Sequence, residues 1–317
     1  MATQQEKRET RRLQRVERER AALAAERRKK LRGYAVAAVL GVAAVAAVAV
    51  VAVGDGGDSG AGQVAAEGRG GGHVHGLGVN PADGAVFVAS HNGLFRAAPG
   101  DTQAHLVGTT GKDVMGFSIV GPNRFLGSGH PGAGEDLPPS LGLILSTDAG
   151  RTFRPVSLLG EADFHVLRAS GSRVYGFDGS SGRFLASGDG GRSWTELPDP
   201  PGTLVDLTID PRDPDRLIAS TDSGLSASSD VGRSWRRLGE QIALVAWAAP
   251  ERLFILDAEG EVAMSLDGGR RFRPTGRVPG EPVSFMAAGN DLYVALSDNR
   301  VMRSSDGGAS WSLRTQV

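Results

Sequence analysis

A chain of 317 residues with 46 glycines and no cysteine excludes disulfides, thiolate metal sites, a cysteine nucleophile and a lipidated cysteine anchor. The formal net charge is −1, but the charges are unevenly distributed: residues 1–33 hold 12 of the 35 basic residues and only 5 of the 36 acidic residues. The remainder has 23 basic against 31 acidic residues and is a poor binder of nucleic acid, whose affinity for proteins depends on cationic side chains.

The first predicted element is a basic cytoplasmic segment, residues 1–33, rich in Glu, Arg, Ala and Leu. This composition is typical either of a helix lying near anionic lipid headgroups or of a solvated charge cluster that sets membrane topology. The two interpretations stay open at this point.

Residues 34–53 are 20 consecutive residues without a charge, mostly Ala and Val, which is the length that crosses a bilayer as a helix. We expect a single transmembrane signal-anchor helix. A cleaved signal peptide is the alternative, although a charged leader of 33 residues is long for one. Basic residues precede the span and Asp55 and Asp58 follow it, so the positive-inside rule predicts a single-pass cell-membrane protein with a cytoplasmic N-terminus and an extracytoplasmic C-terminal body.

Residues 54–72 form a Gly-rich linker in which Val64 is the one large apolar residue. Such a segment has nothing to bury in a core and is expected to act as a flexible tether.

The strongest pattern is an eight-residue repeat, Ser-x-Asp-x-Gly-x-Ser/Thr-aromatic, which begins at Ser146, Ser187, Ser228, Ser265 and Ser304. The Asp can accept backbone N–H groups of its own turn, the Gly can adopt a positive φ, and the aromatic residue can begin the next strand. We therefore predict structural roles for Asp148, Asp189, Asp230, Asp267, Asp306, Trp194, Trp235 and Trp311. The fourth copy departs from the pattern, because Arg271 replaces the hydroxyl residue.

The copies start 41, 41, 37 and 39 residues apart, a period that suits a four-stranded antiparallel blade. Strand-like runs around Leu204, Asp215, Gly224 and Trp235 place the repeat between the third and fourth strands of a blade. Residues 73–108 contain four similar runs without the repeat and predict a degenerate first blade. The expected fold class is all-β: a six-bladed β-propeller over residues 73–317, preceded by the transmembrane helix. We expect whole first and last blades to close the ring, with a strand at 63–67 as the alternative.

These repeats resemble the Asp-box, or BNR, repeats of the sialidase and sortilin-like superfamily and of photosystem assembly-factor propellers. Short sequences in blades one to three, such as HVHGL and DFHVL, further resemble those of bacterial secreted BNR-type glycosyl hydrolases. The resemblance implies a propeller whose boxes are structural and lie away from the ligand face.

The resemblance also raises the question of sialidase chemistry, which uses an arginine triad, a Tyr/Glu nucleophile pair and an Asp acid/base. The nearest arginine motifs are Arg154 and Arg273, each inside an Asp-box strand, and the tyrosines outside the apolar span are Tyr175 and Tyr293, each within a predicted second strand. The sialidase catalytic set is therefore not expected.

All six histidines fall in the first three predicted blades. Propeller topology places the start of each innermost strand and the loop after each second strand on one face, so five of them are expected to converge on one rim: His73, His75, His91, His130 and His165. The sixth, His105, falls in an outermost strand and is expected at the surface. Asp113 and Asp136 join the predicted ligand-binding residues.

Three interpretations of this rim remain open. The imidazoles can close turns as ordinary hydrogen-bonded groups, line a pocket for a polar ligand, or bind Zn²⁺ or Cu²⁺ through His75, His91, His130 and His165. No motif with a fixed metal-ligand spacing decides among them.

Two functions follow from these patterns. The first is a membrane-anchored binding module that presents the histidine rim to a glycan or protein ligand. The alternative is a glycosyl hydrolase, an enzyme in which Glu135 and Asp163 act as the paired acid and base across an open cleft.

Overall fold

The computed structural model describes residues 73–317 except 109–111, 133 and 250. The predicted basic segment, transmembrane helix and linker, together with the alternative closing strand at 63–67, lie outside the described residues. In the part of the chain that is described, no helix has the length and apolar character needed to span a membrane.

The described residues form six antiparallel sheets, each built from four consecutive strands. In blades 1–3 the strands are β1 (Val74–Val79), β2 (Val86–Ser90), β3 (Gly93–Ala97), β4 (His105–Leu106), β5 (Asp113–Gly121), β6 (Arg124–His130), β7 (Leu143–Ser146), β8 (Arg154–Ser157), β9 (Phe164–Ser170), β10 (Arg173–Asp178), β11 (Arg183–Ser187) and β12 (Thr195–Leu197).

In blades 4–6 the strands are β13 (Leu204–Ile209), β14 (Leu217–Thr221), β15 (Gly224–Ser228), β16 (Arg236–Gly239), β17 (Leu244–Ala249), β18 (Arg252–Leu256), β19 (Glu261–Ser265), β20 (Arg273–Arg277), β21 (Pro282–Ala288), β22 (Asp291–Leu296), β23 (Arg300–Ser304) and β24 (Ser312–Gln316). The four strands expected in blade 4 and the four expected in the degenerate blade 1 are present.

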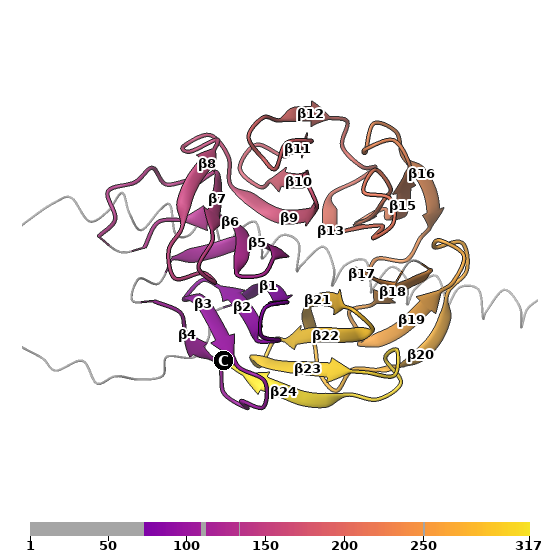
Figure 1. Ribbon diagram of the computed structural model, residues 1–317. Helices are drawn as coiled ribbons and strands as arrows, with labels where there is room; N and C mark the ends of the chain where they lie inside the picture. The colour runs from indigo at the N-terminus through magenta and orange to yellow at the C-terminus, as the bar shows by residue number, and fades with distance from the viewer. Residues whose placement is uncertain (1–72, 109–111, 133, 250) are drawn as a thin grey trace, which may run out of the picture. The chain divides into compact units, whose positions relative to one another are not determined.

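The six sheets surround a common centre as the blades of a propeller (Figure 1). The first strand of each blade is innermost, because β1, β5, β9, β13, β17 and β21 contact one another in turn and β21 returns to β1. Each of the six hydrophobic clusters combines residues of two neighbouring blades. The core of this fold therefore lies between the blades, where twisted sheets pack face to face.

Ring closure joins the whole first and last blades, as the period predicted. Val86 and Val88 of blade 1 share a buried cluster with Tyr293 and Val301 of blade 6. At the outer edge, the backbone of Gln316 donates to Thr102 O at 2.9 Å and accepts from Ala104 N at 2.7 Å. Arg314 adds bonds to the carbonyl oxygens of Ala97, Ala98 and Asp101.

The Asp-box is the turn between the third and fourth strands of blades 2–6. In the first copy, Gly150 N donates to Ser146 Oγ at 2.8 Å, while Thr152 N and Thr152 Oγ1 donate to the two carboxylate oxygens of Asp148 at 2.9 and 2.6 Å. The closing aromatic links two blades: the ring of Trp194 lies 4.9 Å from that of Phe164 in its own blade, between centroids, and its indole N–H donates to Ser157 Oγ of β8 in the preceding blade. Each box thus fixes a hairpin and a blade contact.

A β-bulge near the start of the innermost strand recurs in five of the six blades. The register skips one residue there in β1, β5, β9, β13 and β21, so the skipped residues are His75, Met115, His165, Val205 and Val283. Because a bulge bends its strand and re-aims a side chain, this shared irregularity decides where the side chains of blades 1–3 point.

Candidate functional site

The candidate site is formed at the bulged ends of the innermost strands in blades 1–3. The bulge residue is His75 in blade 1 and His165 in blade 3. Two residues before the bulge stand His73, Asp113 and Asp163, which are therefore equivalent positions in three neighbouring blades. Asp113 pairs across the strand with His130, the last residue of β6. Imidazole and carboxylate groups from three blades meet in this way.

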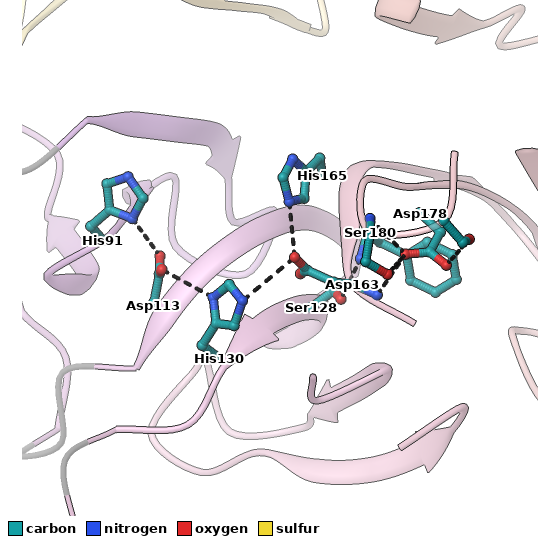
Figure 2. A network of polar contacts seen from close by, with 10 residues as sticks. His91, Asp113, Ser128, His130, Asp163, His165, Asp178 and Ser180 are labelled. Carbon is teal, nitrogen blue, oxygen red and sulfur yellow. Dashed lines mark hydrogen bonds and ion pairs between the residues drawn. The ribbon is translucent and has the colours of Figure 1, made fainter. Parts of the chain in front are cut away.

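Five of these side chains form one connected series, named here the His–Asp chain (Figure 2). His91 Nδ1 lies 2.9 Å from Asp113 Oδ1, and Asp113 Oδ2 lies 3.2 Å from His130 Nδ1. His130 Nε2 is 3.5 Å from Asp163 Oδ2, which is 2.9 Å from His165 Nε2. Imidazole and carboxylate thus alternate across blades 1, 2 and 3.

His75 and His73 adjoin the blade 1 end of this chain. The rings of His75 and His91 meet edge to face with centroids 4.2 Å apart, and His73 lies 6.1 Å from His91 by the same measure. Among the described residues, neither His75 Nε2 nor Asp163 Oδ1 has a hydrogen-bond partner, and both atoms are buried. Buried polar groups are normally paired, so these two atoms are exceptions to the rule.

Burial and charge set the protonation of the site. Burial, with a smaller contribution from His91, lowers the pKa of His75 to about 4, so this ring is neutral at pH 7. The hydrogen bond to Asp113 raises the pKa of His130, against the effect of burial, and Asp163 adds to the rise. Burial opposes ionisation of Asp113, but the hydrogen bonds with His130 and His91 outweigh it and hold the pKa of that carboxyl well below its usual range.

The blade 3 end of the chain is held by backbone and side-chain contacts. Asp178 Oδ1 accepts the backbone N–H of Asp163 at 3.0 Å, and Ser128 Oγ accepts that of Phe164 at 2.9 Å. The Asp163 side chain is only 4% exposed. Asp178 also accepts from Ser180 and Arg183, so its turn positions Asp163.

The remaining predicted residues lie outside this series. Glu135 pairs with Lys112 and accepts the backbone N–H of Gly132, and the contact with Lys112 lowers its pKa despite partial burial. The structure gives Glu135 no bond to Asp163, its predicted catalytic partner, among the described residues. Asp136 is exposed, and His105 is exposed in the outermost strand β4, as expected.

The metal donors that the structure brings together differ from the predicted set. One donor atom from each of His75, His91 and Asp113 lies within 4.8 Å of the other two. By contrast, His130 and His165 face the carboxylates of Asp113 and Asp163. Asp113 and Asp163 thus lie between members of the predicted four-histidine set. Of that set, His75 and His91 are the two that lie together with a carboxylate, that of Asp113.

Two supporting residues were not foreseen from the sequence. Lys112 neutralises Glu135, and Gly179 leaves room for the ring of His165, because a Cβ at that position would lie 2.7 Å from three of its atoms. An alignment of the repeats on their bulges would have pointed to Gly179, since it stands across the strand from Asp163, where His130 stands across from Asp113.

The residues considered for sialidase chemistry lie in outer or second strands of the blades. Arg154 and Arg273 are exposed residues of the outermost strands β8 and β20. Tyr175, in the second strand β10, is buried and donates its hydroxyl to Pro214 O at 2.7 Å. None of these three residues belongs to the His–Asp chain.

No family model matches the chain. Among curated proteins, it is 33% identical over 96 residues to the dispase autolysis-inducing protein of Streptomyces mobaraensis, covering 30% of this chain and 25% of that protein. It is 26% identical over 199 residues to sortilin of Danio rerio, covering 54% of this chain and 24% of sortilin. The chain thus spans about a quarter of the length of each of these relatives.

Solved structures share the fold at low identity. A chain of a nidogen/laminin complex superimposes with a TM-score of 0.56 and 13% identity, covering 69% of this chain and 88% of that chain. The GH74 xyloglucanase of Xanthomonas campestris gives a TM-score of 0.51 and 18% identity, covering 77% and 45%. With its five boxes, six blades and likeness to sortilin, the chain is an Asp-box β-propeller.

Proposed function

We propose that the protein is a non-catalytic binding module whose ligand is held by the His–Asp chain and the adjoining His75. One observation carries this proposal: residues from three blades form one connected polar network in which two buried atoms, His75 Nε2 and Asp163 Oδ1, lack a partner among the described residues. A purely structural network would be expected to satisfy its buried atoms internally. The likeness to a chain of a nidogen/laminin complex, at 13% identity, concerns the fold.

The glycosyl hydrolase alternative has less support from these residues. A general acid in such an enzyme needs a raised pKa, whereas Lys112 lowers that of Glu135. The buried Asp163 is already shared between His130 and His165. The likeness to a GH74 xyloglucanase, at 18% identity, concerns the fold.

We further propose, from the sequence alone, that residues 34–53 anchor the propeller on the outer side of the cell membrane. The charge-free span and the basic residues that precede it support this topology. Protease treatment of intact cells tests it: the propeller should be degraded while a tag at the N-terminus is protected. Protection of the propeller in intact cells would contradict the proposal.

Binding to arrays tests the ligand-binding function. The full chain would be applied to a glycan array and a peptide array, alongside His165→Ala and a matched control, His105→Ala, whose histidine is exposed in β4. We expect the wild type and His105→Ala to retain the same class of ligand and His165→Ala to lose it. Failure to bind either array, or equal binding by all three proteins, would overturn the proposal.

The same preparation distinguishes the enzyme. Incubation of the full chain with xyloglucan, the substrate class of the GH74 neighbour, should release no reducing ends above the level of a heat-inactivated sample. Release that disappears in Glu135→Gln would instead establish the hydrolase.

A further inference from the structure

The blade 1 end of the network carries a group of donors that the His–Asp chain alone does not explain. One donor atom from each of His75, His91 and Asp113 lies within 4.8 Å of the other two. In a tetrahedral site with bond lengths of about 2.0–2.2 Å, neighbouring ligand atoms are roughly 3.4 Å apart. Small side-chain rotations would therefore bring the three donors to one ion.

His75 supplies the second observation. Its Nε2 is buried and has no hydrogen-bond partner in the described part of the chain. The ring stands edge to face against His91, 4.2 Å between centroids, and the bulge in β1 fixes its direction. A fixed ring nitrogen in contact with another imidazole and near a carboxylate has the arrangement of a metal ligand.

The types of donor select the class of metal. Two imidazoles and one carboxylate suit Zn²⁺ and Cu²⁺, whereas Mg²⁺ and Ca²⁺ prefer oxygen ligands throughout. We propose that His75, His91 and Asp113 bind one Cu²⁺ or Zn²⁺ ion per chain, with a coordination position left for a further ligand. For a given set of donors Cu²⁺ binds more tightly than Zn²⁺.

The rest of the His–Asp chain has a role in this arrangement. His130 Nδ1 lies 3.2 Å from Asp113 Oδ2, and His130 Nε2 lies 3.5 Å from Asp163 Oδ2. Groups that hydrogen-bond to a metal ligand orient it, and their loss typically weakens metal binding about 10–100-fold. His130 is therefore a positioning residue for Asp113, and His165 is not among the three donors that lie within 4.8 Å of one another.

This inference rests on the proposed function, since the ion would lie in the same site and leave a coordination position for the ligand that the arrays test. The test uses the full chain without a polyhistidine tag, stripped with a chelator and titrated with Cu²⁺ and with Zn²⁺ against a chromophoric competitor. We expect one equivalent of either ion, tighter binding of Cu²⁺, and an EPR spectrum of the Cu²⁺ form with hyperfine structure from two nitrogens.

Variants assign the ligands. His75→Ala and Asp113→Asn should weaken binding by more than roughly 100-fold, and His130→Gln by about 10–100-fold. His105→Ala, whose histidine is exposed in the outermost strand β4, should retain wild-type affinity. Where His75→Ala loses its native circular dichroism, the isosteric Asp113→Asn carries the test.

Three results would overturn the inference: no uptake of either ion, uptake that is unchanged in both His75→Ala and Asp113→Asn, or loss of uptake in His165→Ala comparable to that in His75→Ala. The third would favour the four-histidine set. If the protein binds no metal but still binds an array ligand that His165→Ala fails to bind, the metal proposal is wrong and the proposed function stands.

Discussion

The ring of His165 lies directly against the backbone of Gly179. A Cβ built at residue 179 would fall 2.7 Å from three atoms of that imidazole, which is closer than non-bonded carbon atoms approach. Glycine at this position is therefore what allows His165 to reach Asp163, 2.9 Å from His165 Nε2 to Asp163 Oδ2.

Gly179→Ala is expected to displace His165 and break its bond to Asp163. Overpacking of this kind typically lowers the free energy of unfolding by about 1–3 kcal/mol, which denaturant unfolding would measure. Gly121→Ala is the matched control, because the nearest atom to its Cβ would be 3.9 Å away, and a change within about 0.5 kcal/mol is expected. Equal stability of the two variants would show that His165 is not confined by this contact.

Asp178 makes stability depend on pH. Burial opposes its ionisation, but bonds from Ser181, the backbone of Asp163, Ser180 and Arg183 lower its pKa to about 2. Because the pKa of Asp178 is lower in the folded state than in the unfolded state, its ionisation stabilises the fold at pH values above the unfolded-state pKa, near 3.8. That stabilisation is lost as the pH falls through the folded-state pKa, near 2.

Asp178→Asn should therefore be less stable than the wild type at pH 6, by about 1–3 kcal/mol for lost charge-assisted bonds. The difference should be constant above pH about 5 and shrink between pH about 4 and 2. Unfolding by urea at a series of pH values measures it. Asp222→Asn, at the matching turn of blade 4, is the control: its carboxylate accepts Thr203 N at 3.0 Å and Ser223 Oγ at 3.2 Å, bonds that an amide oxygen can also accept. A difference that stays the same down to pH 3 would contradict the role given to ionised Asp178.

The fold was predictable because its determinants are local. In each box, Ser, Asp and Gly bond to one another within five residues, as Ser187, Asp189 and Gly191 do, so eight letters of sequence specify a hairpin. A period of about 40 residues then specifies the blade.

The site was predictable only in its composition. The contact between His91 and Asp113 joins residues 22 apart in two blades, and the direction of the His75 side chain depends on the bulge in β1. Periodicity placed the histidines at one end of the blades but could not show that carboxylates alternate with them. The pairing of Lys112 with Glu135 across a loop of blade 2 could not be predicted either, because it depends on loop conformation rather than on strand pattern.

The fourth Asp-box offers a gain of stability. Asp267 accepts the backbone N–H groups of Arg270 and Arg271, but Arg271 has no hydroxyl to bond the second carboxylate oxygen, as Ser234 Oγ does with Asp230 at 2.6 Å. Arg271→Ser should raise the midpoint of thermal unfolding, and Ser234→Ala should lower it, both read by calorimetry. A fall in the midpoint for Arg271→Ser would show that the hydroxyl bond does not contribute to the turn.

Closure of the ring depends on Arg314 more than its place near the C-terminus suggests. Its guanidinium donates to the carbonyl oxygens of Ala97, Ala98 and Asp101 in blade 1, and because these lie more than 200 residues away, the bonds form only when the first and last blades meet. Arg314→Ala should lower the free energy of unfolding by about 1–3 kcal/mol and speed unfolding in stopped-flow measurements.

The matched control for this last change is Arg237→Ala. That arginine is exposed and contacts Glu240 and Ser223 within its own blade, so its loss should cost no more than about 0.5 kcal/mol. Because Arg237 also bonds a carbonyl oxygen but joins no second blade, the comparison isolates the contribution of closure. Identical unfolding rates for the two variants would mean that the buried cluster around Val86 and Tyr293 holds the ring without help from its outer edge.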